Sequence, residues 1–378
     1  MNHLFIIFIC AFSILTIGTT SSQAQQTTKA KQAYVVDYTT GQVLLDKNSK
    51  EKMPTSSMSK VMTSYMVFDA LKSGRIQMGT KFNVSKKAWK KGGSKMFVKV
   101  DTKVTVEDLL RGVIVQSGND ATIVLAEGLE GSEDAFAKKM TRKALEIGME
   151  DSNFMNASGW PDPKHYSTAR DLVVMTRAII EDFPEYYTMF GEKEFTYSNI
   201  KQANRNPLLY LDIGADGLKT GHTEIAGYGL IGTAKKDDRR VVMVVNGLDS
   251  EADRKSESAR LIKWALQNFK NEQILNQGQE ITQAPVKMGV VDNVLLSVND
   301  DILLTVPDTG DKVYKLSAKY NSPLIAPLKA GDEIGKLVIS IPNIEAVEYP
   351  LYVAQDVPKL GFFMTIIEKI KHFIAGKL

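Results

Sequence analysis

Strand-like alternation of apolar residues occurs in two regions far apart in the chain, and this separation limits the possible folds. The stretch AYVVDYTTGQVLLDKNS alternates on both sides of a turn at Thr40 and Gly41, which predicts a β-hairpin. The same period returns in GLKTGHT, GYGLIGTAKK and RRVVMVVNGL, and helical spacings dominate between the two regions. We therefore expect strands from both regions to share one antiparallel sheet, with helices on its faces, in an α/β (α+β) domain.

The chain changes character after about Asn271. Short strands separated by turns follow, with hardly any helical period, and this predicts a small all-β domain over 271–357. A length of 378 residues also favours two domains over one.

The last segment, 358–378, is amphipathic. Within KLGFFMTIIEKIKHFIAGKL, bulky apolar residues occupy one helical face and charged residues the other, so the segment is too charged to span a bilayer. We expect a terminal helix that lies in a membrane interface. The alternative is a helix that docks on its own domain or in an oligomer.

The first segment, 1–24, has the pattern of a secretory signal peptide. A short apolar run precedes small polar residues, and we expect cleavage after Ala24; an uncleaved membrane anchor is the alternative. Cys10 is the only cysteine and lies inside this segment, so the mature chain would have no disulfide and no thiolate site. Four scattered histidines argue against a zinc enzyme, and a net charge of +3 shows no basic footprint for nucleic acid.

The stretch PTSSMSKVMTSY contains a candidate nucleophile. Ser57 and Lys60 are three residues apart, so on a helix they share one face and the amine can reach the hydroxyl. Ser57 would lie in the first turn, where its free backbone N–H and the positive end of the helix dipole favour an oxyanion. Taken alone, serines at a helix start can equally be capping residues.

Two later stretches favour an active site over capping. QSGND places Ser117 and Asn119 on a turn between two helical segments, where a hydroxyl can pass a proton and an amide can hold a carbonyl or a lysine. DGLKTGHT places Lys219, Thr220 and Gly221 on a strand. There they would supply a charge, a hydroxyl and room for a peptide that pairs along the strand edge.

In this order, Ser-x-x-Lys, Ser-Gly-Asn and Lys-Thr-Gly are the motifs of β-lactamases and penicillin-binding proteins. The contexts SMSKVMT, QSGNDA and DGLKTGHT resemble the D-alanyl-D-alanine carboxypeptidases of the low-molecular-mass penicillin-binding group. The resemblance covers nearly the whole chain. It implies a transpeptidase-like catalytic domain over 25–270, with a helical subdomain, that acts on peptidoglycan stem peptides.

The resemblance also implies roles in proton transfer. Ser57 would attack the carbonyl between the two terminal D-alanines, and neutral Lys60 would take its proton. Burial and the charge of Lys219 would lower the pKa of Lys60. Ser117 would return a proton to the departing D-alanine, and water would hydrolyse the acyl-enzyme.

The remaining implied roles concern substrate binding. His222 matches the position of the second oxyanion donor through its backbone N–H, beside that of Ser57. Lys219, Thr220 and Arg205 are candidates for holding the free carboxylate, since the fork of an arginine suits that group. Arg205 has an ordinary alternative as a surface ion-pair residue.

These expectations define the partners and the location. The enzyme would need no metal or organic cofactor, would be acylated by β-lactams at Ser57, and would work at the periplasmic face of the cytoplasmic membrane. Three alternatives stay open: a DD-endopeptidase that cuts cross-links, a non-catalytic wall-binding homologue, and a β-lactamase. Against the β-lactamase, NFMNASGWPDPKHYSTARD has no glutamate to serve as its deacylation base.

Overall fold

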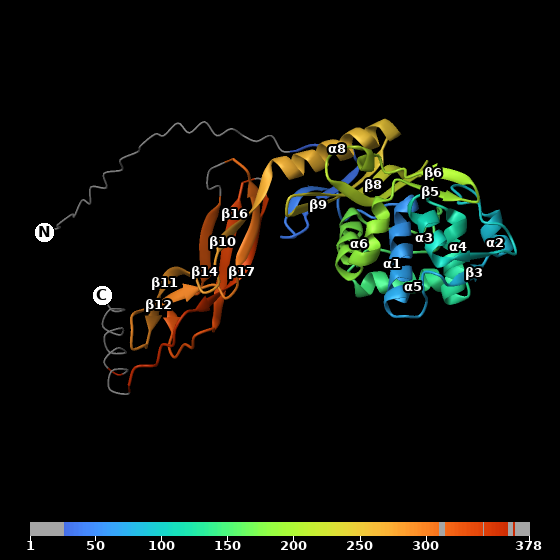
Figure 1. Ribbon diagram of the computed structural model, residues 1–378. Helices are drawn as coiled ribbons and strands as arrows, with labels where there is room; N and C mark the ends of the chain where they lie inside the picture. Colours follow the sequence, from blue (N-terminus) through green and yellow to red (C-terminus); the bar gives the residue numbers. More distant parts are fainter. Residues whose placement is uncertain (1–25, 310–313, 343, 362–365, 367–378) are drawn as a thin grey trace.

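The computed structural model describes residues 26–309, 314–342, 344–361 and 366. Its central feature is a five-stranded antiparallel sheet in the order β2-β1-β9-β8-β7 (Figure 1). The expected sharing of one sheet by both regions of alternation is confirmed. The strands are β1 Gln32–Asp37, β2 Val43–Lys47, β7 Ala215–Thr223, β8 Gly227–Lys236 and β9 Arg239–Leu248.

Helices cover both faces of this sheet, as the sequence predicted. On one face α8 contributes Leu261, Ile262 and Ala265 to a buried cluster that also contains Val35 and Met243 of the sheet. The other face carries the helical middle of the chain. The helices are α1 Lys60–Lys72, α2 Lys86–Lys90, α3 Val106–Ile114, α4 Asn119–Glu130, α5 Glu133–Glu146, α6 Ala169–Asp182, α7 Pro184–Tyr187 and α8 Glu251–Gln267.

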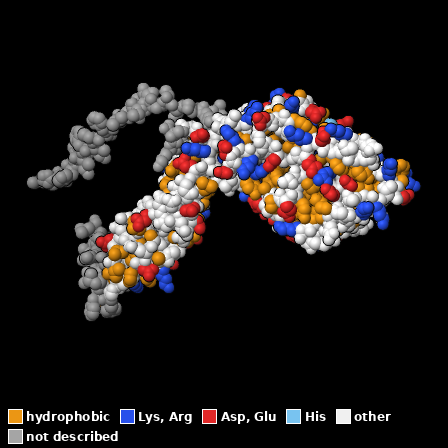
Figure 2. Space-filling view, in the orientation of Figure 1, with side chains coloured by type: hydrophobic (Ala, Val, Ile, Leu, Met, Phe, Trp, Pro, Cys, Tyr) orange, Lys and Arg blue, Asp and Glu red, His pale blue; other side chains and the backbone are white. Residues whose placement is uncertain are grey.

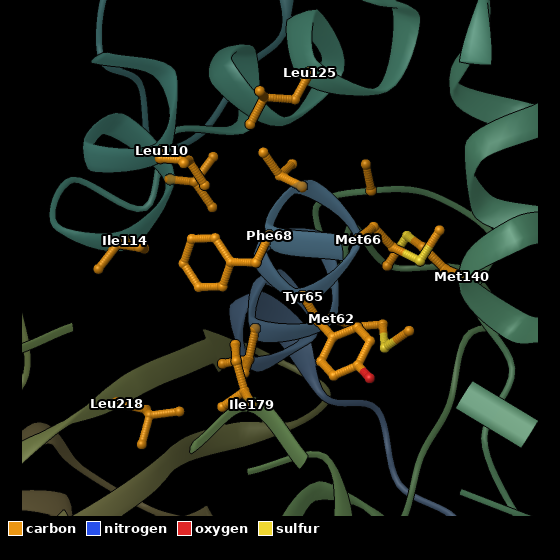
Figure 3. Packing of buried hydrophobic residues seen from close by; sticks show 14 of the residues in the cluster. Met62, Tyr65, Met66, Phe68, Leu110, Ile114, Leu125, Met140, Ile179 and Leu218 are labelled. Carbon is orange, nitrogen blue, oxygen red and sulfur yellow. The ribbon is translucent and has the colours of Figure 1, made fainter. Parts of the chain in front are cut away.

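Helix α1 is the centre of the helical subdomain and is buried on almost every side. Phe68 stacks on Tyr186 with ring centroids 5.2 Å apart and meets Phe183 edge-on at 5.9 Å. Figure 3 shows side chains from other helices and from β7 surrounding it, among them Leu110 and Leu218. Because α1 is enclosed, residues at its start have fixed positions.

Short elements connect these helices and frame the site. They are the 3-10 turns η1 Ser56–Ser59, η2 Thr188–Gly191 and η3 Pro207–Tyr210, and two hairpins, β3 Lys81–Asn83 with β4 Lys103–Thr105 and β5 Glu194–Tyr197 with β6 Ile200–Ala203. The helix expected from Ser57 therefore begins as the tighter turn η1, and α1 proper starts at Lys60.

The second part of the described chain is all-β, as predicted, and extends away from the sheet and helices (Figure 1). A six-stranded sheet has the order β14-β16-β17-β12-β11-β15, and β10 pairs with β13. The strands are β10 Phe269–Leu275, β11 Glu280–Lys287, β12 Asn293–Ser297, β13 Ile302–Pro307, β14 Lys315–Tyr320, β15 Leu324–Ile325, β16 Glu333–Ile341 and β17 Ile344–Val353.

Contacts around Asp37 and around the β1–β2 turn join the two parts. Arg239 binds Asp37 at 2.7 Å and donates to the carbonyls of Ala265 and Phe269, where the chain passes from α8 into β10. At the hairpin turn, the hydroxyls of Thr40 and Thr305 lie 2.6 Å apart.

The expected signal peptide, 1–24, lies outside the described residues, as does most of the amphipathic tail. In the part of the chain that is described, no helix combines the length and apolar character needed to cross a bilayer. On the face shown in Figure 2, acidic and basic side chains are interspersed rather than gathered by sign.

Candidate active site

The nucleophile motif lies where η1 passes into α1. Lys60, the first residue of α1, is buried, with 1% of its surface exposed. Its Nζ lies 2.8 Å from Ser57 Oγ. The expected contact between the lysine and the serine is therefore present in the free protein.

Two further partners fix the Lys60 amine. Nζ donates to Asn119 Oδ1 and to the carbonyl oxygen of Ser158, each at 2.7 Å. Asn119 Nδ2 donates to the carbonyl of Gly92, which agrees with its oxygen facing the lysine. A neutral amine has two N–H groups and one lone pair. With both N–H groups given to oxygens that only accept, the lone pair is left for the hydroxyl proton of Ser57.

The electrostatic surroundings favour that neutral form. Burial holds the pKa of Lys60 well below its usual value, and the positive charges of Lys219 and Arg205 lower it further. Burial also lowers the pKa of Lys219 to about 7, with Arg205 and Arg254 adding repulsion. In this site the basic side chains of Lys60, Lys219, Arg205 and Arg254 therefore repel one another when charged.

Two of these cations, Lys219 and Arg205, form no ion pair within the described residues. Lys219, on β7, donates only to the carbonyl of Thr220, at 3.1 Å. Arg205 lies exposed and donates to Ser94 Oγ at 2.6 Å. Neither forms an ion pair with a described carboxylate, unlike Arg254, which pairs with Glu251. The expected alternative of Arg205 as a surface ion-pair residue is therefore wrong for the described part of the chain, and an anionic ligand would relieve the repulsion.

Other predicted residues lie near this centre with less direct contacts. Ser117 precedes α4, has a φ of +59°, and its buried hydroxyl has no hydrogen-bond partner within the described residues. Thr220 is buried beside Lys219 on the edge strand β7. The ring of His222 is exposed and stacks on Tyr228 at a centroid distance of 3.9 Å.

Gly221 serves a different purpose from the one expected. A Cβ on Gly221 would lie 2.8 Å from the carbonyl oxygen of Thr55 and 3.1 Å from Met58 Cγ. The absent side chain therefore makes room for η1, and the prediction that it leaves space for a ligand was wrong. The glycine lets the nucleophile turn pack directly against β7.

A cleft of about 560 Å³ opens over Ser57. Asn119 and His222 line it as predicted, together with residues of the 153–167 loop, including Ser158, Gly159 and Trp160. Lys60 does not line the cleft itself, and its link to the cleft is the hydrogen bond to Ser57. Ser57, Asn119 and His222 thus share one accessible cavity, whereas Ser117, Lys219, Thr220 and Arg205 do not line it.

Sequence reasoning missed the contribution of this loop. Ser158 supplies a carbonyl to Lys60, and Gly159 packs so closely that a Cβ there would lie 1.7 Å from Ser56 O. His165 belongs to the same loop, and its Nε2 lies 2.8 Å from Ser59 Oγ, within the nucleophile turn. Burial lowers the pKa of His165 to about 4, so the ring is neutral at pH 7.

Arg254 was missed as well. It lies on α8, is buried, and is close enough to lower the pKa of Lys219. Its guanidinium also lies 5.5 Å from the centre of the Tyr228 ring that supports His222. Nothing in the helical period of α8 marks this arginine, because its role depends on where α8 crosses the sheet.

Comparison with known proteins gives two family matches. Residues 19–250 match the model described as D-alanyl-D-alanine carboxypeptidase, and residues 269–359 match the model described as penicillin-binding protein 5, C-terminal domain. The D-alanyl-D-alanine carboxypeptidase DacA of Haemophilus influenzae is 38% identical, over 88% of this chain and 86% of that protein.

Solved structures agree. The D-alanyl-D-alanine carboxypeptidase DacD from Francisella tularensis is 31% identical with a TM-score of 0.81, covering 89% of this chain and 95% of that one. Penicillin-binding protein D2 from Listeria monocytogenes, in its ampicillin-bound form, is 28% identical with a TM-score of 0.58, covering 64% of this chain and 98% of that one.

Proposed function

This chain belongs to the D-alanyl-D-alanine carboxypeptidase family, and we propose that it removes the terminal D-alanine from peptidoglycan stem pentapeptides with Ser57 as the nucleophile. One observation carries the assignment of the nucleophile. Lys60 gives two hydrogen bonds to acceptors and keeps its third direction for the Ser57 hydroxyl. In this proposal 25–270 is the catalytic domain.

Acylation begins when a D-Ala-D-Ala end lies in the cleft. Ser57 Oγ attacks the carbonyl between the two D-alanines while Lys60 takes its proton, which converts the amine to an ammonium. The backbone N–H groups of Ser57 and His222 hold the oxyanion that forms. The preorganised contacts of Lys60 reduce the rearrangement that proton transfer requires.

Breakdown of the tetrahedral intermediate requires a proton on the leaving amine. Lys60 carries that proton, and Ser117 relays it, since its hydroxyl is buried close to the site and otherwise unpartnered in the described chain. The leaving D-alanine departs, and water attacks the acyl-enzyme with Lys60 again as the base. Asn119 holds the amine in place throughout.

The free carboxylate of the substrate selects the chain end. Lys219 and Arg205 supply positive charge without a described counter-ion, and Thr220 supplies a hydroxyl. A bound carboxylate would raise the pKa of Lys219 and hold it protonated. The charged clamp therefore forms fully only with a substrate that has a free terminus.

Partners and location follow from the same proposal. β-Lactams acylate Ser57, because their amide occupies the place of the scissile bond. The chain is exported, and the amphipathic segment 358–378 holds it peripherally at the periplasmic face of the cytoplasmic membrane. The all-β domain then separates the catalytic cleft from the bilayer.

The nucleophile is tested by intact-mass measurement after incubation with benzylpenicillin. A single penicilloyl adduct is expected on the wild type and none on Ser57→Ala. An unmodified wild type of native fold would contradict the proposal and favour a non-catalytic wall-binding homologue.

The substrate is tested by product analysis. Release of D-alanine from a pentapeptide is expected. Cleavage of a purified cross-linked dimer without D-alanine release would assign the protein as a DD-endopeptidase.

A further inference from the structure

The far end of the all-β part brings three segments together, remote from the catalytic cleft (Figure 1). They are the stretch 287–292, which joins β11 to β12, the segment 324–329, which contains β15, and the segment 357–360, where the amphipathic stretch 358–378 begins. β15 pairs with β11, and isolated bridges join Gly289 to Lys359 and Leu328 to Val357. We call these three segments the tip.

The tip exposes large apolar side chains. Val290, Val291 and Ile325 are 54%, 39% and 69% exposed. Among the described residues of 269–361, the only other large apolar side chain that is exposed by more than a third is Leu303, at 37%. Figure 2 shows apolar side chains at this end of the molecule. Because exposed apolar residues are concentrated here rather than scattered, the tip has the character of a contact surface.

Lysines lie among these apolar side chains. Lys287 is the strand partner of Ile325, and Lys329 and Lys359 belong to the other two segments. All three lysines are exposed, and none forms an ion pair with a described carboxylate. The three segments contain only one carboxylate of their own, Asp292. The tip is therefore both apolar and positively charged.

This combination suits the surface of an anionic lipid bilayer. Apolar side chains enter the boundary between headgroups and acyl chains, while the amines of lysines stay with the phosphates. An apolar protein partner would be a poorer match, because the amines would lose water without gaining a counter-charge.

The position of the amphipathic stretch 358–378 also favours a bilayer. The N–H of Leu360 donates to the carbonyl of Met288 at 2.9 Å, and the N–H of Val290 donates to the carbonyl of Pro358 at 3.0 Å. The stretch therefore begins within hydrogen-bond distance of the exposed valines. If it lies in a membrane interface, the tip is held against the same interface.

We propose that the tip is a second membrane contact, in which its apolar side chains enter the headgroup region of an anionic bilayer and its lysines bind lipid phosphates. The inference rests on the proposed location of the chain and adds a contact that the amphipathic stretch does not supply. A terminal stretch alone tethers the protein, whereas a second contact on the folded part also fixes the angle at which the all-β part stands on the membrane.

Cosedimentation of the chain from Gln25 onward with vesicles of phosphatidylethanolamine and phosphatidylglycerol tests the contact. Ile325→Asp should lower the partition coefficient by about fivefold, the size expected for one partly inserted apolar side chain. Lys287→Gln should lower it by about fivefold on these vesicles and leave it unchanged on neutral phosphatidylcholine. Leu303→Asp is the matched control, since β13 pairs with β10 and not with the tip, and it should bind as the wild type does.

A fluorescent label tests insertion directly. Without 1–24 the chain has no cysteine, so Ile325→Cys and Leu303→Cys can each carry a single nitrobenzoxadiazole group. Vesicles should shift the emission of the label to the blue at position 325 and not at position 303. Equal acylation of all variants by penicillin in solution serves as the control for folding.

The outcomes separate the tip from the proposed location. Wild-type binding that survives both Ile325→Asp and Lys287→Gln, or equal label responses at the two positions, would overturn the tip contact alone. A wild type that binds no vesicles would refute the location and the tip contact together. Stronger binding by Ile325→Asp would show instead that the amphipathic stretch docks on the tip. A blue shift that depends on protein concentration without vesicles would assign the tip to a second copy of the chain.

Discussion

Gly159→Ala tests how the loop positions the base. The added Cβ would lie 1.7 Å from Ser56 O and 2.4 Å from Ser56 C, and both are backbone atoms that cannot rotate away. Restoring a contact of even 3.0 Å requires the loop to move by about 1.3 Å. Ser158, the preceding residue, would be displaced with it, and its 2.7 Å hydrogen bond to Lys60 would be lost.

The magnitude has two parts. Gly159 has a φ of +77°, and placing a Cβ at such a φ costs about 1 kcal/mol. Loss of a hydrogen bond to a buried amine adds about 1–3 kcal/mol. Because misplacement of a catalytic group by about 1 Å can cost 100-fold, we expect the rate of acylation by penicillin to fall by about that factor.

Gly131→Ala is the matched control. Gly131 ends α4 with a φ of +73°, and a Cβ there would meet nothing within 4 Å, so it carries the same backbone strain without the clash. The melting temperature of Gly159→Ala should lie about 4–8 °C below that of Gly131→Ala. Equal melting temperatures and equal acylation rates for the two variants would refute the argument that this contact holds Lys60 in place.

Three further predictions follow from the charges. The pH profile of kcat/KM should be bell-shaped, because activity rises as Lys60 loses its proton, at a pH well below 10.5, and falls as Lys219 of the free enzyme loses its charge near pH 7. A flat profile across pH 5–9 would contradict this. Lys219→Met should abolish activity yet raise the free energy of unfolding, because each unit by which folding lowers the pKa of Lys219 costs the folded state about 1.4 kcal/mol. The gain in stability should be largest at and below pH 7 and should shrink toward pH 10.5. Urea titrations that show no such trend would disprove it. Asp120→Asn should destabilise by about 2–3 kcal/mol, because the carboxylate accepts the N–H groups of Met96, Phe97 and Val98 and an amide nitrogen cannot; unchanged urea denaturation would count against this.

The sequence predicted most of the framework for physical reasons that are local. Alternation around Thr40 and Gly41 depends on neighbours in the chain, and the predicted hairpin is present. The Ser57–Lys60 contact was also predictable, because residues three apart meet in a helix and still do so when the first turn is a 3-10 turn.

What could not be predicted depends on approaches between distant segments. Ser158 acts through its carbonyl, which every residue possesses, so no side-chain pattern distinguishes it. Gly221 follows a lysine and a threonine of the motif and was expected to face the ligand. In the structure the space beside Gly221 is filled by η1, which packs against β7. A strand pattern in the sequence does not reveal that packing.

The double connection between the two parts of the molecule has a mechanical consequence. One attachment lies at the passage from α8 into β10, around Arg239, and the other at the hairpin turn, through Thr40 and Thr305. The two attachments belong to one network, because Asp37 accepts hydrogen bonds from Arg239, Thr40 and Asn271, and β17 also contacts β2. The all-β part therefore acts as a strut, and a load applied at its far end is transmitted to β1 and β2, on the side of the sheet opposite the edge strand that carries Lys219.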